Sequence, residues 1–289
     1  MLSGQRSDLQ RCLLKLEAVE VPFCPPRDHT FRSLISFQNQ NLCELRLYHN
    51  WFTGPDDIEA WIRECCSYKG FPRLTAFELD FHLAHSDYHL TDGLKEALLD
   101  FVKMHPRLEL LTLPEFPDEM IRVLDTLPVL KALTFRMTRY DDVIAALCRS
   151  HLPPSLTWLL IRRGGSRDAS RIQPTEWVRA SIAHLTFSNP LIQSQDLVLG
   201  ILSRLPILRS ISFQGSNLSG EGGFHQDEMP ELAQNLADRL PVVEYIDLGW
   251  TGQFRVTRAM DQSKSVIRTE SSDIQRLLSY YRPSSHALQ

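Results

Sequence analysis

A short strand pattern, Leu-x-x-Leu-x-Leu, recurs along the whole chain and constrains its fold more than any other feature. In the clearest copy, Leu108, Leu111 and Leu113, alternate apolar residues lie on one face of a strand. Four copies begin in succession, each 26 residues after the one before, at Leu130, Leu156, Ile182 and Leu208. A strand this short cannot bury its apolar face alone, so we expect the copies to stack side by side.

The pattern can be placed about nine times, with a weak first copy. Longer spacings between some copies indicate loop insertions, which a repeat array tolerates. The apolar positions of the copies are Leu16, Val19, Val21; Leu42, Leu45, Leu47; Leu74, Phe77, Leu79; Leu108, Leu111, Leu113; Leu130, Leu133, Phe135; Leu156, Leu159, Ile161; Ile182, Leu185, Phe187; Leu208, Ile211, Phe213; and Val243, Ile246, Leu248.

The segments between the strands have a helical pattern. Thr91 or Asp92 can cap a helix that precedes Leu108, with an apolar stripe made by Leu94, Leu98, Phe101 and Val102. Similar segments follow Pro55, Pro117, Asp141, Ser194 and Pro230. Alternating strands and helices predict an α/β solenoid with parallel strands on one surface and helices on the other.

The C-terminal part departs from the repeat. Phe254, Val256 and Arg258 alternate, as do Val266 and Arg268, which indicates a hairpin. A helix with the apolar residues Ile274, Leu277, Leu278 and Tyr281 is expected to follow. We therefore predict a solenoid at residues 1–250, a capping hairpin and helix at 251–282, and a disordered tail at 283–289.

Charge and composition narrow the class of protein. The formal net charge of -4 disfavours nucleic acid as a partner, because phosphate binding depends on accumulated Lys and Arg. The six cysteines show no CxxC spacing, which favours free thiols in a reducing compartment. No segment has the length and hydrophobicity of a signal peptide or a membrane helix. We expect a cytoplasmic or nuclear protein that binds neither nucleic acid nor membrane.

Motifs for catalysis are missing from the sequence. His82, His85 and His89 could approach a metal only if their loop folded back, and a solvated loop is the competing interpretation. Cys65 fits an apolar helical stripe, which favours a buried structural thiol. The glycine-rich stretch 215–223 lacks the GK[ST] sequence of a phosphate-binding loop. We expect a non-catalytic protein without a cofactor or a metal.

Three stretches carry a family resemblance: LTDGLKEALLDFVKMHPRLELLTL, FPDEMIRVLDTLPVLKALTF and LVLGILSRLPILRSISF. They resemble leucine-rich repeats of the ribonuclease-inhibitor-like kind and, more narrowly, the leucine-rich regions of F-box-like proteins of basidiomycete fungi. The resemblance covers roughly residues 16 to 270. It implies a horseshoe with strands on the concave face and helices on the convex face.

The same resemblance implies the substrate-binding part of an F-box ubiquitin-ligase adaptor. We recognise no F-box here, because Phe116-Pro117-Asp118-Glu119-Met120, which is similar to an F-box opening, falls within the repeat register. The ubiquitin-ligase core would be a partner only if an F-box lies upstream. The alternative is a leucine-rich-repeat interaction scaffold that is unconnected to ubiquitin.

Residues between the buried strand positions are expected to project from the concave face and bind a protein partner, either a substrate or a scaffolded protein. The candidate partner-binding residues are Arg46, Tyr48, Glu78, Asp80, Arg136, Trp158, Leu160, Arg162, His184 and Tyr245. The competing interpretation is that curvature or the C-terminal element covers them. The arginine-rich loop 162–171 could receive an acidic peptide or a phosphate group, or could be a solvated loop.

Overall fold

The chain forms two compact units, Met1–Leu130 and Lys131–Gln289. The structure, a computed structural model, describes residues 18–23, 40–49, 55–67, 70–81, 90–115, 119–137, 152–163, 183–188, 205, 207–214, 228–249 and 252–269. None of the helices in these ranges combines the length and hydrophobicity that crossing a bilayer requires.

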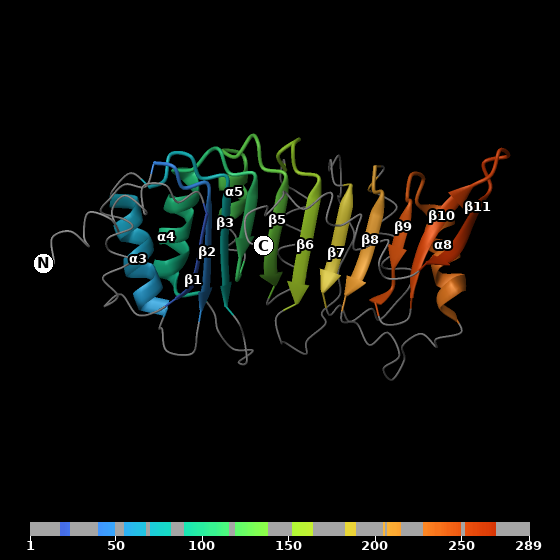
Figure 1. Ribbon diagram of the computed structural model, residues 1–289, viewed down its shortest axis with the longest axis horizontal. Coiled ribbons are helices and arrows are strands. Elements are labelled where there is room, and N and C mark those ends of the chain that lie inside the picture. Colours follow the sequence, from blue (N-terminus) through green and yellow to red (C-terminus); the bar gives the residue numbers. More distant parts are fainter. Residues whose placement is uncertain are drawn as a thin grey trace, which may run out of the picture. The chain divides into compact units, whose positions relative to one another are not determined.

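The first unit alternates strands and helices, and its four strands pair in chain order as parallel neighbours (Figure 1). The register aligns equivalent positions of the repeat, because Leu45 pairs with Phe77 and Phe77 with Leu111. The elements are β1 (Ala18–Phe23), β2 (Glu44–His49), α3 (Pro55–Ser67), β3 (Ala76–Phe81), α4 (Asp92–Lys103), β4 (Leu110–Leu113) and α5 (Met120–Leu124).

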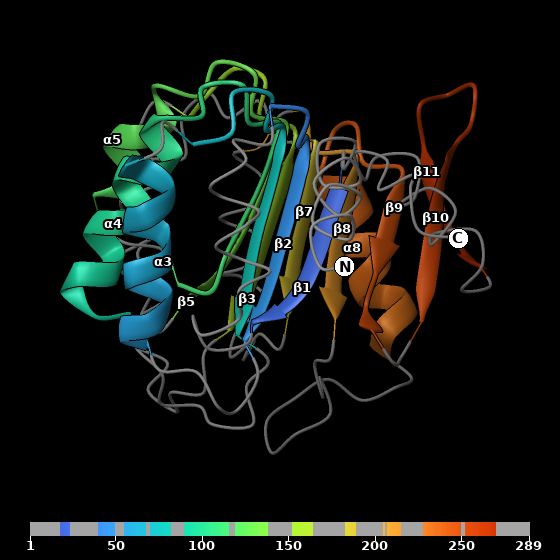
Figure 2. The ribbon, with the colours of Figure 1, turned by 60° about the vertical axis from the view of Figure 1, so that its left-hand side comes forward.

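The core of this unit lies between its strands and its helices. Figure 2 shows α3 and α4 side by side in a layer apart from β1, β2 and β3. The rings of Phe77 on β3 and Phe101 on α4 lie 4.7 Å apart, and both side chains are fully buried. Replacing one core leucine with alanine would therefore destabilise the unit by about 2–5 kcal/mol.

Helix α4 has both the cap and the apolar stripe that its sequence predicts. The hydroxyl of Thr91 accepts a hydrogen bond from the backbone N–H of Leu94 at 3.2 Å. The helix ends at Lys103, ahead of Pro106. Its buried residues are Leu94, Ala97, Leu98, Leu99, Phe101 and Val102.

The second unit begins with five parallel strands in chain order (Figure 1). Strand β10 then runs antiparallel to β9, and β11 runs antiparallel to β10. The elements are β5 (Ala132–Met137), β6 (Trp158–Arg163), β7 (His184–Ser188), β8 (Ser210–Gln214), α8 (Met229–Arg239), β9 (Tyr245–Asp247), β10 (Gln253–Arg258) and β11 (Lys264–Thr269).

One pair of backbone hydrogen bonds recurs at the start of successive strands. The carbonyl of Ala183 accepts hydrogen bonds from the N–H groups of both Arg209 and Ser210, at 2.7 and 3.0 Å. The carbonyls of Cys43, Thr75, Lys131, Thr157 and Arg209 make the same pair of bonds to the following coil. Repetition of one hydrogen-bond geometry makes each unit an α/β repeat solenoid.

A second repeated turn places a buried residue three positions before five of the strand patterns. The N–H of Leu74 donates to the carbonyl of Phe71, and the equivalent carbonyls belong to His105, Leu127, Pro153 and Leu205. His105 is the polar member of this buried row. Its Nδ1 bonds to the Phe101 carbonyl at 2.5 Å, and its Nε2 accepts the Phe71 N–H at 2.9 Å. The imidazole thereby joins two successive coils.

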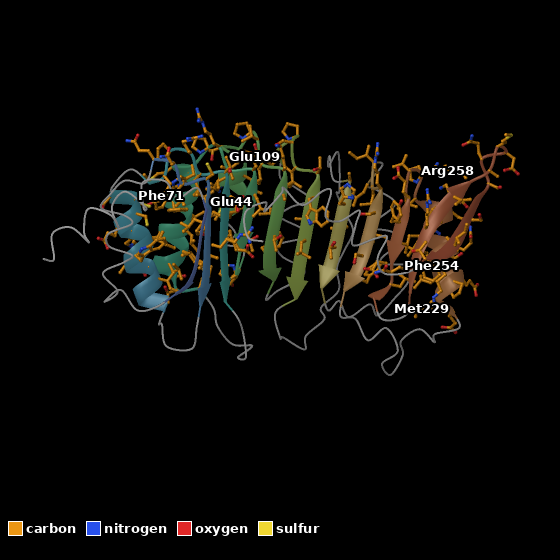
Figure 3. All side chains as sticks on the ribbon, in the orientation of Figure 1. Glu44, Phe71, Glu109, Met229, Phe254 and Arg258 are labelled. Atoms are coloured by element: carbon orange, nitrogen blue, oxygen red, sulfur yellow. The ribbon has the colours of Figure 1, made fainter. Side chains whose placement is uncertain are left out.

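The C-terminal hairpin packs against α8. Phe254, which is labelled in Figure 3, and Val256 of β10 are buried. Lys264 of β11 donates to the carbonyls of Ala237 and Leu240 at 2.6 and 2.8 Å. These carbonyls belong to the C-terminal turn of α8, where a cation is favourable. The hairpin is therefore present as predicted, while its capping role stays a prediction.

The structure confirms all nine predicted strands and the helices α3, α4 and α8. Helix α5 is shorter than the sequence pattern suggests, because it ends at Leu124 rather than near Leu127. The helices expected after Asp141 and Ser194, and the one that contains Ile274, lie outside the described residues. The horseshoe curvature and the proposed domain boundaries stay predictions.

Candidate functional site

Two rows of side chains cross the strands of the second unit on the face away from its core. In a strand, successive side chains point to opposite faces, so register partners of a non-core residue share its face. The Trp158 row comprises Ala132, Trp158, His184, Ser210, Tyr245, Arg255 and Ile267. The Ser212 row, two residues further along each parallel strand, comprises Thr134, Leu160, Thr186, Ser212, Asp247, Gln253 and Thr269.

The Trp158 row is accessible on either side of the buried His184, whereas Ala132 at its β5 end is buried. Trp158, Ser210 and Tyr245 are half-buried, Arg255 is exposed, and the Ile267 side chain is 53% exposed. Large aromatic and guanidinium groups with this accessibility are the types that anchor protein interfaces. The row therefore offers mixed apolar and cationic contacts on one surface.

His184 is the buried link within the row. Its ring centroid lies 5.5 Å from that of Trp158, and its Nδ1 lies 2.8 Å from the Ser210 hydroxyl oxygen. Burial, with a contribution from the positive charge of Arg209, lowers the pKa of His184 to about 4. The imidazole is consequently neutral at pH 7, and such a weak base would not activate Ser210 as a nucleophile.

The Ser212 row is closed by its own hydrogen bonds. The Ser212 hydroxyl donates to Asp247 Oδ2 at 2.7 Å, and the Gly249 N–H donates to Asp247 Oδ1 at 2.9 Å. Burial raises the pKa of Asp247, and hydrogen bonds from Ser212, Gly249 and Gln253 oppose that rise. Only 6% of Asp247 is exposed, so its carboxylate is a structural acceptor rather than a surface charge.

On the corresponding face of the first unit, the described arginine lies beside two carboxylates. Arg46 on β2 lies 3.5 Å from Glu44 and 3.7 Å from Glu78 on β3. Tyr48 and Asp80 are register partners on the same two strands, and their side chains lie outside the described residues. Partly exposed ion pairs of this kind, at 3.5 and 3.7 Å, add little to stability.

The remaining binding candidates from the sequence lie on β5 and β6. Leu160 is half-buried between Thr134 and Thr186 in register, and Arg136 pairs with Arg162 along β5 and β6. The side chains of both arginines lie outside the described residues. So do residues 164–171 of the arginine-rich loop, the three histidines of 82–89 and the glycine-rich stretch 215–223.

The described residues also bear on metal binding and on thiol chemistry. Within the described ranges, no cluster of three His, Cys, Asp or Glu side chains could hold a metal ion. Burial raises the pKa of the Cys65 thiol, with smaller contributions from Cys66 and Glu64, as expected for a structural cysteine on the core side of α3.

Sequence reasoning missed Arg255 and Ile267 as members of the Trp158 row. Both lie in the hairpin, beyond the last Leu-x-x-Leu-x-Leu copy, so the repeat template did not reach them. The antiparallel register, in which Tyr245 faces Arg255 and Arg255 faces Ile267, brings them onto the same face.

No family model and no curated protein matches the chain. Two solved structures are similar at 11% sequence identity. One is the leucine-rich repeat-containing protein LegL7 from Legionella pneumophila, with a TM-score of 0.42 and coverage of 94% of this chain and 92% of that one. The other is an internalin from Listeria monocytogenes, with a TM-score of 0.27 and coverage of 83% and 86%. The α/β repeat fold itself rests on the strand register and the repeated hydrogen bonds.

Proposed function

We propose that the chain is a leucine-rich-repeat scaffold that binds a protein partner through the non-core strand face of its second unit. The observation that carries this function is the Trp158 row, in which half-buried aromatic residues and an exposed arginine share one surface. Aromatic and arginine side chains supply most of the affinity in protein interfaces. The candidate residues Trp158, Leu160, His184 and Tyr245 are the centre of this surface.

The buried polar groups beneath this surface support a structural rather than a catalytic role. His184 is hydrogen-bonded to Ser210, and Asp247 is hydrogen-bonded to Ser212. These hydrogen bonds fix the side chains in place. A surface whose side chains are already ordered loses less conformational entropy when a partner binds. His184, which is 6% exposed, contributes by holding Trp158.

The proposed function is tested by substituting Trp158 and identifying the proteins that bind the chain. Affinity purification of the full chain from the cells that express it, followed by mass spectrometry, gives the partners. We expect Trp158→Ala and Tyr245→Ala to lose a partner that Ile207→Ala retains. Ile207 is a matched control because it is 44% exposed but lies in the turn before β8, away from the row.

Retention of every partner by both aromatic variants, with unfolding curves equal to that of the unmodified chain, would remove this face from the proposed function. The unfolding curves are needed because Trp158 packs on a buried histidine. Tyr245→Ala provides an independent variant, since Tyr245 lies two strands away from His184.

A narrower proposal follows from the resemblance to F-box-like proteins. In that case the partner is a ubiquitin-ligase substrate, and the full-length gene product also binds the adaptor and cullin subunits in the cytoplasm or nucleus. Recovery of those subunits with the natural full-length protein would support it. Their consistent absence from the same purification would leave the scaffold without a connection to ubiquitin.

A further inference from the structure

The Trp158 row includes a cation that has no acidic partner within the described residues. Arg255 lies on β10 between Tyr245 of β9 and Ile267 of β11 in register. Its side chain is exposed. In contrast, Arg46 of the first unit lies near Glu44 and Glu78, and Arg209 lies 3.7 Å from Glu244. Arg255 is therefore positioned to bind a negative charge from outside this face.

The acidic residue of the two rows, Asp247, already has hydrogen-bond partners. Asp247 is the acidic residue of the Ser212 row, and its carboxylate accepts hydrogen bonds from Ser212, Gly249 and Gln253. It is also buried, whereas Arg255 is exposed. Asp247 therefore does not neutralise the surface charge at Arg255.

Two hydroxyl groups lie on the same face of the hairpin as Arg255. Thr257 and Ser265 are register partners on β10 and β11, and their hydroxyl oxygens lie 2.7 Å apart. They share the face of Arg255, because Thr257 lies two residues further along the same strand. The Thr257 hydroxyl donates to the Ser265 carbonyl at 3.2 Å, so the guanidinium group of Arg255 supplies the donors on this face. A guanidinium group is suited to a carboxylate, which accepts several hydrogen bonds at once.

Building on the proposed function, we propose that the Trp158 row binds an extended segment of a partner protein that places a carboxylate side chain on Arg255 and an aromatic or aliphatic side chain on Trp158. Four strand spacings separate Arg255 from Trp158 across β9, β8 and β7. With about 4.8 Å between neighbouring strands, the span is about 19 Å. An extended chain advances about 3.3 Å per residue, so the two anchors lie about six residues apart in the partner.

A displayed library of random 12-residue peptides, selected on the purified full chain, tests this recognition. We expect enrichment of Asp or Glu together with Trp, Tyr, Phe or Leu about six residues away. The dissociation constants of the selected peptides are expected to rise about tenfold with Arg255→Glu, in line with the loss of one charge-assisted contact. Trp158→Ala should weaken the same peptides.

Arg258→Glu is the matched control. Arg258 is an exposed arginine on the same strand, but it lies three residues away from Arg255 and so faces the other side of the hairpin. We expect peptide affinity within about twofold of the unmodified chain for this variant. Exchanging the acidic residue of a selected peptide for Lys should restore binding to Arg255→Glu.

Three outcomes would overturn the inference: no enrichment of any peptide, enrichment without acidic residues, or equal binding to the unmodified chain and Arg255→Glu. If the selected peptides lack acidic residues or ignore Arg255→Glu but still bind more weakly to Trp158→Ala, the proposed function stands. Only the carboxylate contact with Arg255 is then refuted. If partner proteins and peptides alike are insensitive to both Trp158→Ala and Tyr245→Ala, the proposed function fails as well. Unfolding midpoints equal to that of the unmodified chain show that each variant is folded.

Discussion

Gln234 on α8 and Val266 on β11 are joined by a hydrogen bond in which the side-chain oxygen of Gln234 accepts the Val266 backbone N–H at 3.3 Å. The side-chain nitrogen of the same glutamine donates to the Lys264 carbonyl at 2.9 Å. The Ser263 carbonyl accepts a hydrogen bond from the Ala259 N–H, on the side of β11 that faces β10. The Lys264 carbonyl and the Val266 N–H therefore point to the other edge of β11, away from β10. One side-chain amide thus occupies backbone positions that a further strand would use.

Replacing Gln234 with leucine should therefore destabilise the chain and promote self-association. Two buried or partly buried backbone groups would lose their partner, which costs about 1–3 kcal/mol of unfolding free energy. The edge of β11 would also become available for pairing with a second chain. Urea unfolding and light scattering over a range of protein concentrations measure the two effects.

Asn235→Ala is the control for this change, because Asn235 follows Gln234 on α8 and is also only partly exposed. We expect that variant to remain within about 0.5 kcal/mol of the unmodified chain. A Gln234→Leu protein with unchanged stability and unchanged mass would show that the amide does not protect the edge.

His105 should make the chain less stable in mild acid. Burial lowers the pKa of His105, while its hydrogen bond to the Phe101 carbonyl partly opposes that shift. The unfolded chain therefore takes up the proton first, and stability is lost as the pH falls below the ordinary histidine pKa of about 6.5. The unfolding free energy should fall by at most about 1.4 kcal/mol per pH unit from this group.

The variant His105→Leu separates this effect from other titrating groups. Its stability will be lower at pH 7.5, because the Phe71 N–H loses its acceptor, but its pH dependence between 7.5 and 5 should be shallower. Urea unfolding at several pH values measures both quantities. Identical slopes for the two proteins would contradict the assigned role of His105.

Gly70→Ala should be more damaging than Gly93→Ala. Gly70 has a φ of +63°, and an added Cβ would lie 2.5 Å from Nε2 of the buried His105. The left-handed conformation alone costs about 1–2 kcal/mol for alanine. At Gly93 an added Cβ meets the end of the Glu59 side chain, which can move, and alanine favours the helix by about 1 kcal/mol. Thermal unfolding should show a clear loss for the first variant only, and equal midpoints would refute the comparison.

Asp247→Asn should stabilise the chain at neutral pH. The pKa of Asp247 is raised by burial, so folding disfavours its ionised form. When folding raises the pKa of a carboxyl group, the unfolding free energy falls as the pH increases through the range in which that group loses its proton. Asparagine removes the charge and can also donate to the buried Gln253 Oε1, which has no hydrogen-bond partner among the described residues. The expected gain is about 1 kcal/mol at pH 7.

The gain from Asp247→Asn should shrink toward pH 3, where the aspartate is protonated in the unmodified chain. Urea unfolding at pH 7 and pH 3 gives the two differences. A loss of stability at pH 7 would mean that the ionised carboxylate is better accommodated by Ser212 and Gly249 than its burial suggests.

The repeating core was predictable because its period is written in the residue types. Leu111, Leu133 and Ile211 could be placed in equivalent strands from their spacing, and either Thr91 or Asp92 is expected to cap α4, where the structure has Thr91. These features depend on local preferences and on the alternation of side chains along a strand. The strand register then follows from the need to align the apolar positions.

Other features depend on neighbours that the repeat pattern does not specify. His105 occupies a position at which other coils carry Phe71, Leu127 or Leu205, and only the nearby backbone groups make a histidine acceptable there. The 6% exposure of His184 could not be predicted from its place in the template, because burial depends on the size of the surrounding side chains. Arg255 joined the Trp158 row only through antiparallel pairing.

A shared strand register places Trp158, His184, Ser210 and Tyr245 on one non-core face. Couplings across hydrogen bonds, measured by NMR on the deuterated full chain, test that register directly. We expect couplings from the amide nitrogen of Arg209 to the carbonyl carbon of Ala183, and from that of Glu244 to the carbonyl carbon of Arg209. Couplings displaced by one residue would turn these side chains toward the core and contradict the proposed binding surface.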